Sequence, residues 1–459
     1  MTTRITSENI TDATITATDL AAGAGSTDWQ AVITADGSTV TTMVSGRGYF
    51  VDTSSAAGIL KFPLSASRGD YVEIKDYART FGTNNVTVQR NGHNVDGTAD
   101  DATLDSDAET VKFVYIDSTK GWSALNSQSV ARYGANFITA SGGTETTSGI
   151  YKIHTFTGDG NFVVSALGNQ PATMNKVSYV VVAGGGGGGS GGGPTGTSGV
   201  AGAGGGGGGF REAKVPGDPY TDSPLDAGTG LTISTGTYPI TVGGGGSAGT
   251  RPSPIGGTGS NAVFSTITSA GGGRGGGRGG PDACADGGNG GSGGGSTFPN
   301  PASSGDNGVG NTPPVSPPQG TNGGAGTPNS NNPSGGGGGG ATAVGANAGD
   351  GPHPSNAAAG GAGGTGATTS ISGSPTGYAG GGGGGGGGDI PADPDGGAGG
   401  TATQGGGAGT RTGDPALPAG VAGTANTGGG GGGGGSYPGR LGGAGGKGVV
   451  IIRYQYTAS

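Results

Sequence analysis

The chain has 459 residues, of which 120 are glycine, 30% are hydrophobic and 11% are charged. Its formal net charge of -9 argues against a nucleic-acid backbone or an anionic membrane surface as the partner, and its single cysteine, Cys284, excludes an intrachain disulfide framework. No apolar stretch approaches the roughly 20 residues that span a bilayer, so we expect no membrane insertion and two or three domains.

Residues 1–26 are rich in threonine and weakly patterned. We interpret them as an N-terminal arm. They lack the basic region followed by an apolar one that marks a secretory signal, which favours assembly in a cytoplasm.

Residues 27–125 predict a β-sandwich or barrel. Short runs of β-branched and aromatic residues alternate with turn signals, and no helical periodicity of useful length occurs. Two dipeptides, Asp36-Gly37 and Asn91-Gly92, each predict a β-hairpin. A strand over 111–117 turns at Lys120-Gly121 into Trp122.

Part of this module resembles a β-module of tailed-phage virion proteins. The residues that carry the resemblance lie between Arg47 and Trp122, and include Tyr49-Phe50-Val51-Asp52-Thr53, Gly69 to Tyr77 and Asn84 to Gly92. The resemblance implies a virion component that attaches to other virion proteins through this module. It implies no chemistry.

Residues 126–149 are polar and rich in glycine, serine and threonine, and we interpret them as a neck. Beyond them, 151–156 and 162–165 predict a hairpin across Gly158-Asp159-Gly160. Val177 to Ala183 is almost continuously apolar, as in a strand that is covered on both faces.

The glycines concentrate between Gly184 and Gly448. Unbroken runs stand at Gly184 to Gly189, Gly204 to Gly209, Gly335 to Gly340, Gly380 to Gly388 and Gly428 to Gly435. Such a segment has few side chains for a hydrophobic core and loses much backbone entropy on ordering. It is therefore either disordered or held by its own backbone hydrogen bonds.

The ordered alternative is a bundle of polyglycine II helices. A helix of this type has three residues per turn and makes no internal hydrogen bonds, so every N–H and C=O needs a partner on a neighbouring segment. Glycine lets the backbones approach closely enough to bond. The segments between the runs then become turns at the two ends of a slab.

Three other interpretations compete with the bundle. Collagen needs glycine at every third position with abundant proline, which this sequence lacks. A disordered flexible linker is the default for Gly/Ser-rich sequence. An RNA-binding arginine-glycine tract is suggested by Arg274 and Arg278, although two arginines in an acidic chain give a weak electrostatic footprint.

The two borders of the glycine region favour the bundle. Residues 449–456 predict a strand with Ile452, Tyr454 and Tyr456 on one face. If this strand pairs with the one over 177–183, the glycine region is a large insertion in a small β-framework spanning 150–459. A passive linker would need no such anchors.

The pattern Val-Val-Val-Ala, polyglycine, Tyr-Pro-Ile-Thr-Val-Gly and finally Gly-Val-Val-Ile-Ile-Arg-Tyr resembles the glycine-rich domain of phage tail-fibre and adhesin proteins. The resemblance covers Ile150 to Tyr456. It implies a polyglycine II sandwich whose distal loops bind a receptor on the host surface, a glycan or an outer-membrane protein. Phage fibres are often trimers, so a homotrimer is expected.

No constellation for catalysis is evident. The three histidines, His93, His154 and His353, stand apart from any nucleophile and carboxylate pattern, and clustered zinc ligands are missing. We therefore expect no enzyme and no cofactor. The weak calcium candidates are the acidic loops Asp389, Asp393 and Asp395, and Asp218, Asp222 and Asp226.

Large side chains between the glycine runs are the candidate receptor contacts, because aromatic and arginine groups suit sugar or protein recognition. They are Phe210, Arg211, Tyr220, Phe298, Tyr378, Tyr437 and Arg440. Each could instead cap an end of the slab.

We therefore predict an all-β chain with essentially no α-helix, in which a β-framework carries a polyglycine II bundle over 184–448. The function expected is that of a non-enzymatic phage fibre or adhesin in the virion. The alternatives are a capsid or tail decoration without a receptor and an ice-binding protein built from the same helices.

Overall fold

The computed structural model describes residues 27–125, 137–168, 175–192, 199–251, 253–277, 286–297, 307–327, 333–349, 358–388, 396–412, 419–437 and 439–457. The chain divides into two compact units, one before and one after residue 136. The described residues form strands and irregular segments with no α-helix, which confirms the all-β prediction, and none of their segments is a helix that could cross a membrane.

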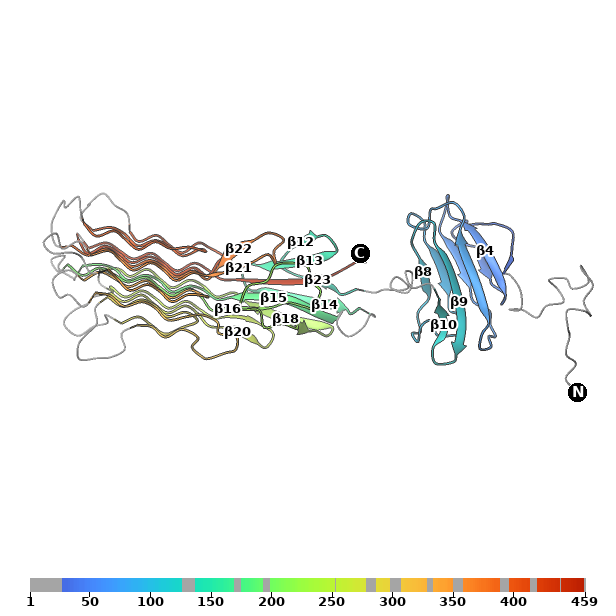
Figure 1. Ribbon diagram of the computed structural model, residues 1–459, viewed down its shortest axis with the longest axis horizontal. Helices are drawn as coiled ribbons and strands as arrows, with labels where there is room; N and C mark the ends of the chain where they lie inside the picture. Colours follow the sequence, from blue (N-terminus) through green and yellow to red (C-terminus); the bar gives the residue numbers. More distant parts are fainter. Residues whose placement is uncertain are drawn as a thin grey trace, which may run out of the picture. The chain divides into compact units, whose positions relative to one another are not determined.

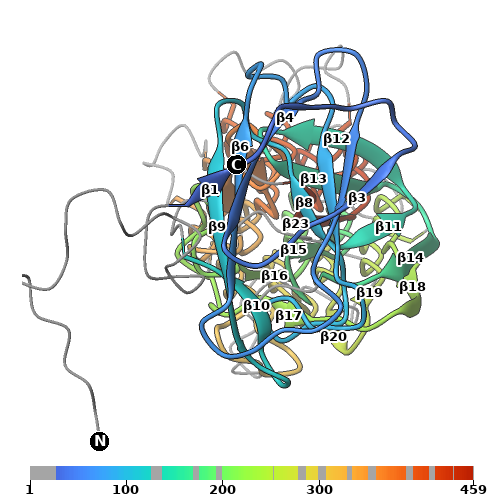
Figure 2. The ribbon, with the colours of Figure 1, turned by 90° about the vertical axis from the view of Figure 1, so that its right-hand side faces the viewer.

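The first unit is a sandwich of two sheets (Figures 1 and 2). One sheet has the order β1-β4-β6-β9-β10, with β2 beside β4, and the other has the order β3-β5-β7-β8. Their bounds are β1 Asp28–Trp29, β2 Ile33–Thr34, β3 Val40–Thr42, β4 Arg47–Asp52, β5 Gly58–Lys61, β6 Tyr71–Asp76, β7 Val86–Gln89, β8 Ala102–Leu104, β9 Thr110–Asp117 and β10 Gly121–Ala124.

From β2 to β7 the chain alternates between the two sheets, so that β2, β4 and β6 are parallel neighbours in one and β3, β5 and β7 in the other. The hairpin predicted at Asp36-Gly37 is therefore wrong. The Asp36 carboxylate accepts hydrogen bonds from the backbone N–H groups of Ser38 and Thr39. The N–H of Gly37 donates to the carbonyl of Ala57, which directly precedes β5. These bonds bend the chain toward the opposite sheet.

The predicted hairpin at Asn91-Gly92 is also wrong. The turn itself forms, with positive φ angles at both residues and a bond from His93 N–H to Arg90 C=O. However, β7 pairs with β5 and β8, and the Asn91 side chain donates to the Phe62 carbonyl. The turn at Gly121, by contrast, joins β9 and β10 as an antiparallel pair.

The core of the first unit lies between its sheets. Trp122 is fully buried and stacks on Phe62, with ring centroids 4.7 Å apart. Trp29 lies outside this core, on the far face of β4, where its ring stacks on Phe50.

The second unit begins with a β-framework of two main sheets, of order β11-β14-β18-β19-β20 and β12-β13-β23-β15-β16, with β17 beside β15. A separate hairpin is formed by β21 and β22. The bounds are β11 Thr139–Ser141, β12 Thr144–Ser148, β13 Tyr151–Phe156, β14 Gly160–Ala166, β15 Lys176–Val182, β16 Phe210–Ala213, β17 Leu231–Thr232, β18 Gly236–Thr241, β19 Ala262–Phe264, β20 Ile267–Ser269, β21 Ala367–Thr369, β22 Thr376–Tyr378 and β23 Val449–Gln455.

Two predictions for this region need correction. Part of the predicted neck over 126–149 belongs to the framework, because β11 and β12 pair with β14 and β13; residues 126–136 lie outside the described chain. The predicted hairpin of β13 and β14 does not form either, since the two strands lie in different sheets. The connecting Asp159 carboxylate binds the N–H of Val242 after β18, which draws the chain across to the other sheet.

The strands that border the glycine region pair with each other, as predicted. β15 and β23 are antiparallel neighbours, and their last register pair, Val182 with Val449, stands directly at the two borders. Both strands are covered on both faces. One core lies between the two main sheets, and a second core, around Val180, Val182 and Ile451, lies between the β12-to-β16 sheet and the β21–β22 hairpin.

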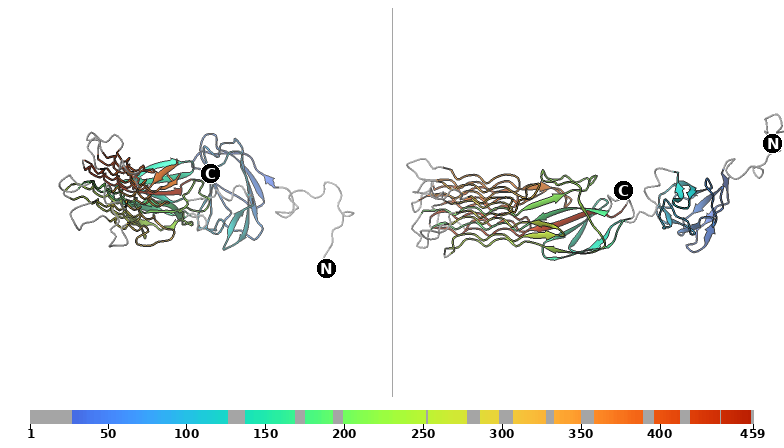
Figure 3. Two further views of the ribbon diagram at one scale, coloured as in Figure 1. Left: turned by 60° about the vertical axis from the view of Figure 1, so that its left-hand side comes forward. Right: turned by 90° about the horizontal axis from the view of Figure 1, so that it is seen from below.

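The glycine region forms a bundle of extended segments that run away from the framework side by side (Figure 3). The segment 184–192 shows their helical repeat. The N–H of Gly184 bonds to the carbonyl of Ser260, and that of Gly187 to Gly257, so that both partners advance by three residues. Two further neighbours are contacted with the same spacing, from Gly185 and Gly188 to Gly446 and Gly443 and from Gly186 and Gly189 to Gly206 and Ala203. A three-residue repeat with no internal bonds is the polyproline II type of helix.

The carbonyls of the same segment bind three other neighbours, which are parallel to it. They accept bonds in the same three-residue rhythm, from Gly272 and Gly275, Gly246 and Gly249, and Gly431 and Gly434. The segment is thus enclosed on all sides by three antiparallel and three parallel helices. The predicted polyglycine II bundle is the arrangement that the described residues adopt.

Unbroken glycine runs occupy the interior of this bundle because every residue of an enclosed helix faces a neighbouring backbone. An ideal Cβ on Gly187 would overlap the carbonyl oxygen of Ser247, and one on Gly205 that of Gly186. At the edge, by contrast, a Cβ on Gly244 would meet no heavy atom within 4 Å. Edge helices accordingly carry exposed side chains, such as Ala359 and Thr365, at positions separated by a multiple of three residues.

Replacing an enclosed glycine should destabilise the second unit far more than replacing an edge glycine. We expect Gly187→Ala to lower the free energy of unfolding by about 1–3 kcal/mol or more through overpacking. Gly244→Ala should leave it unchanged or raise it by about 0.4–1 kcal/mol, because alanine restricts the unfolded chain. Thermal and denaturant unfolding of the two variants checks this, and equal effects would contradict the enclosed bundle.

Candidate functional site

The end of the bundle away from the framework carries two of the predicted receptor contacts. Gly184 directly follows β15, so Gly191 lies near the far end, where its N–H bonds to the carbonyl of Arg440. Tyr437 and Arg440 are half-buried in the turn that begins at Ser436. Phe298, which is also a predicted contact, lies outside the described residues.

Hydroxyl groups hold this turn in place. The Ser436 hydroxyl donates to the Gly388 carbonyl and lies 2.9 Å from the Thr412 hydroxyl, and the Thr412 hydroxyl accepts the N–H of Tyr437. Three helices therefore end on one hydrogen-bonded cluster, which gives the turn a rigid base.

Phe210, Tyr220 and Tyr378 do not lie at the far end. Their side chains are buried in the framework core that also contains Val180 and Ile451, with exposed fractions of 1, 5 and 4%. Their burial corrects the prediction that they contact a receptor, because a side chain in a core offers no surface to a partner. They are instead the capping groups that the sequence left as an alternative. For Phe210 and Tyr378 the signal was their position beside a glycine run, where a helix enters the framework; Tyr220, in the loop after β16, carried no such signal.

Arg211 lies on β16 of the framework, opposite Val181 of β15, and is half-buried. It is therefore on the sheet and away from the turns at the far end. Of the seven predicted contacts, only Tyr437 and Arg440 are brought together by the described structure at that end.

The acidic loop that contains Asp218, Asp222 and Asp226 does not gather its carboxylates into one site. Asp218 pairs with Arg453, Asp222 with Lys214, and Asp226 accepts the N–H of Lys214. No group of three possible metal ligands occurs among the described residues. The other calcium candidates, Asp389, Asp393 and Asp395, lie outside them.

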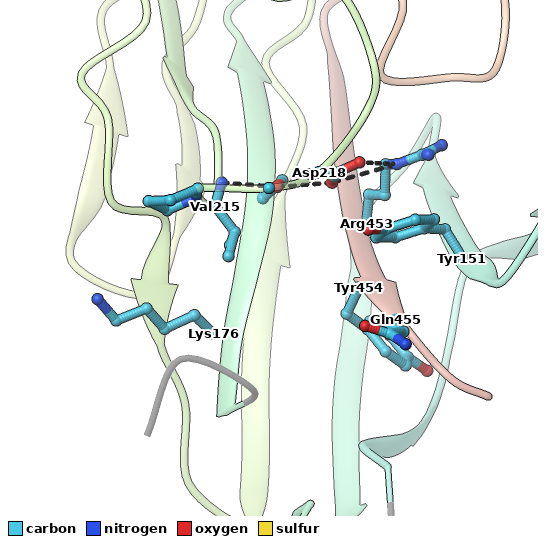
Figure 4. A pocket seen from close by; sticks show the side chains of 10 residues that line it. Tyr151, Lys176, Val215, Asp218, Arg453, Tyr454 and Gln455 are labelled. Carbon is cyan, nitrogen blue, oxygen red and sulfur yellow. Dashed lines mark hydrogen bonds and ion pairs between the residues drawn. The ribbon is translucent and has the colours of Figure 1, made fainter. Parts of the chain in front are cut away.

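A buried ion pair lies on one face of the β12-β13-β23-β15-β16 sheet, between β23 and the loop 215–218 (Figure 4). The Nε of Arg453 donates to both carboxylate oxygens of Asp218, at 2.9 and 3.2 Å. The Ser178 hydroxyl donates to the same carboxylate and accepts the N–H of Val215. The loop is thereby fixed to the sheet, and a cavity of about 200 Å³ remains beside it.

Arg453 falls within the strand predicted over 449–456, but the sequence analysis gave it no role. The signal was present, because a charged residue inside an otherwise apolar run, Val-Val-Ile-Ile-Arg-Tyr, is buried only with a partner. The partner itself, Asp218, could not be identified from a loop with several carboxylates.

A second polar group is buried beside the same loop. Glu212 on β16 accepts the Thr369 hydroxyl at 2.6 Å and the N–H of Ser223 at 2.9 Å. Burial raises its pKa above the ordinary value, although these hydrogen bonds oppose the shift. Burial likewise raises the pKa of the Tyr220 hydroxyl. Strand β16, the loop and the β21–β22 hairpin are tied together here.

His154 on β13 is buried between the sheets with both ring nitrogens bonded. Nδ1 lies 2.7 Å from the Gly142 carbonyl and Nε2 lies 3.0 Å from the Tyr454 hydroxyl. A carbonyl can only accept, so Nδ1 carries the proton and Nε2 accepts from tyrosine. Burial lowers the pKa of His154 below 6.5, while the Gly142 bond and Glu145 oppose the shift.

Residues 157–455, from the connection between β13 and β14 to the end of β23, match the family model described as a glycine-rich domain. The chain belongs to this family. No curated protein matches the sequence. The match spans the framework strands from β14 to β23 as well as the polyglycine bundle, and both lie in the second compact unit.

The buried and the exposed ion pair of the acidic loop should differ in their effect on stability. We expect Asp218→Ala to cost about 3–5 kcal/mol, because it leaves Arg453 buried without its counter-charge. Asp222→Ala, which breaks a partly exposed pair with Lys214, should cost no more than about 1 kcal/mol. Denaturant unfolding measures both, and a small effect of Asp218→Ala would show that the loop is not anchored by this pair.

The second unit should lose stability on acidification through His154. Because its folded-state pKa is lowered, the contribution of the neutral ring is complete above about pH 6.5 and is lost as the pH falls below that value. We expect His154→Gln to show a smaller loss of melting temperature between pH 7 and 5 than the parent protein. His93→Gln, in the first unit, is the control. An unchanged pH dependence in His154→Gln would refute the assignment.

Proposed function

We propose that the protein is a non-enzymatic fibre or adhesin subunit of a phage virion, assembled in the host cytoplasm. Its first unit attaches to other virion proteins, and turns at the far end of the polyglycine bundle contact a glycan or an outer-membrane protein of the host. Three copies associate in the fibre.

What supports the proposal is the rigid presentation of those turns. Binding residues commonly lie on loops that a rigid scaffold positions. Here the scaffold is a bundle whose enclosed helices bond to neighbours on every side, and it carries the half-buried Tyr437 and Arg440 on an anchored turn at its far end. The resemblance of the first unit to phage virion modules supplies the attachment role.

The test is adsorption of the purified full-length protein to cells that the phage infects. We expect saturable binding and inhibition of infection. Tyr437→Ala should weaken binding about tenfold, as expected for an aromatic contact worth 1–2 kcal/mol. Tyr77→Ala, an exposed tyrosine of the first unit, should leave binding unchanged.

Other outcomes assign the protein differently. Failure of the full-length protein to bind cells or to compete with infection would favour a capsid or tail decoration without a receptor. Inhibition of ice growth, without binding to cells, would favour the third alternative. Equal effects of Tyr437→Ala and Tyr77→Ala would place the contact elsewhere on the chain.

A further inference from the structure

Two asparagine side chains hold the segment 307–311, which lies at the edge of the polyglycine bundle. The Oδ1 atom of Asn289 accepts a hydrogen bond from the N–H of Val309 at 2.7 Å. The Oδ1 atom of Asn322 accepts one from the N–H of Gly310 at 2.9 Å. Both asparagines are exposed and stand on segments that lie beside 307–311.

The bonds of an enclosed helix show what these side chains replace. In the segment 184–192, three successive N–H groups bond to three different neighbouring helices, and each contact recurs after three residues. In 307–311, one of the three directions meets a helix, because the N–H groups of Gly308 and Asn311 bond to carbonyls of the segment 291–294. In the other two directions, the asparagine oxygens stand where an enclosed helix would meet backbone carbonyls.

The same replacement occurs at two more positions. The Oδ1 atom of Asn347 accepts the N–H of Ala325 at 2.9 Å, and that of Asn261 accepts the N–H of Gly271 at 2.9 Å. Beside Asn347, the N–H of Ala348 donates to the carbonyl of the same Ala325. A carboxamide has the same C=O acceptor as a peptide group and carries no charge. It can therefore substitute for one peptide unit of an absent helix.

An edge with unpaired backbone groups is a template for pairing with another chain. The rule is stated for β-sheets, and it applies to polyglycine helices because they also bond sideways through backbone groups. On other outer helices, exposed side chains such as Ala359 and Thr365 hold another backbone away by their bulk. The asparagines do more, since they also bond to the N–H groups that a second backbone would use.

We propose that Asn289, Asn322 and Asn347 close this edge of the bundle against a helix from a second copy of the chain. Each carboxamide takes the place of a backbone carbonyl that such a copy would supply. The edge along 307–311 and 321–327 is then a face at which subunits stay apart. Any association between copies uses other faces of the protein.

Hydrogen exchange of the full-length protein, followed by NMR at single amides, tests the replacement of carbonyls. We expect Asn322→Ala to speed exchange of the Gly310 N–H about tenfold, because the amide loses its acceptor. Asn322→Asp keeps an acceptor oxygen at this position and should leave the exchange slow. Thr401→Ala, which removes an exposed hydroxyl from another outer helix, is the control. Exchange at Gly310 that is equally slow in Asn322→Ala and in the parent would overturn the proposal.

Sedimentation velocity tests the closed edge. The triple variant Asn289→Ala, Asn322→Ala and Asn347→Ala opens three N–H groups to a partner. We expect a shift to species larger than those of the parent protein, in a proportion that rises with concentration. Alanine itself does not bar a neighbouring helix, since Ala203 is fully buried inside the bundle.

A second triple variant, Thr258→Ala, Thr401→Ala and Thr424→Ala, is the matched control. It removes the same number of exposed polar side chains from other outer helices, and we expect it to sediment like the parent. The proposal fails if the asparagine variant also sediments like the parent, or if the two triple variants associate equally. Where the asparagine triple variant does not fold, Asn322→Ala and Thr401→Ala are compared in the same way.

Discussion

The structure of the second unit depends on hydrogen bonds between neighbouring polyglycine helices. A helix with three residues per turn presents each N–H and C=O outward, and in this bundle successive groups of one helix meet different neighbours. Ordering glycine is entropically expensive, and side-chain burial offers little in return here. The interactions that remain to offset this entropy cost are the backbone hydrogen bonds between enclosed helices, whose residues are shielded from water.

The framework determines where the bundle starts and ends. β15 and β23 are neighbours in one sheet, so the chain leaves and re-enters the bundle at adjacent points. Aromatic residues such as Phe210 and Tyr378 stand where helices meet the framework and complete its core. The same sheet is tied to the acidic loop through Arg453 and Asp218, so the bundle grows from a base that is itself cross-linked by buried polar groups.

This construction separates rigidity from surface chemistry. Enclosed helices consist almost entirely of glycine, and the few other side chains buried in them are small, such as Ser190 and Ala203, whereas turns and edge helices carry exposed side chains. A scaffold of this kind can present varied turns without changes to its interior, which suits the adhesin role that we propose.

Several features of the fold followed from local sequence. The unbroken glycine runs left two possibilities, disorder or polyglycine II helices held by backbone hydrogen bonds, and the structure has the helices. The apolar runs at 177–183 and 449–456 predicted adjacent strands covered on both faces, and this is how β15 and β23 lie. The turn at Gly121 was also predicted, since β9 and β10 are consecutive in the chain and in the sheet.

What the sequence by itself determined, then, was the type of each element and the anchoring of the glycine region. Only the tertiary structure decided the partners: Asp36-Gly37 leads to the opposite sheet, β13 and β14 separate, and Phe210, Tyr220 and Tyr378 enter a core. Turn dipeptides and large side chains report local conformation and size. Which strand lies alongside, and which residue becomes buried, depends on contacts between segments that are distant in the chain.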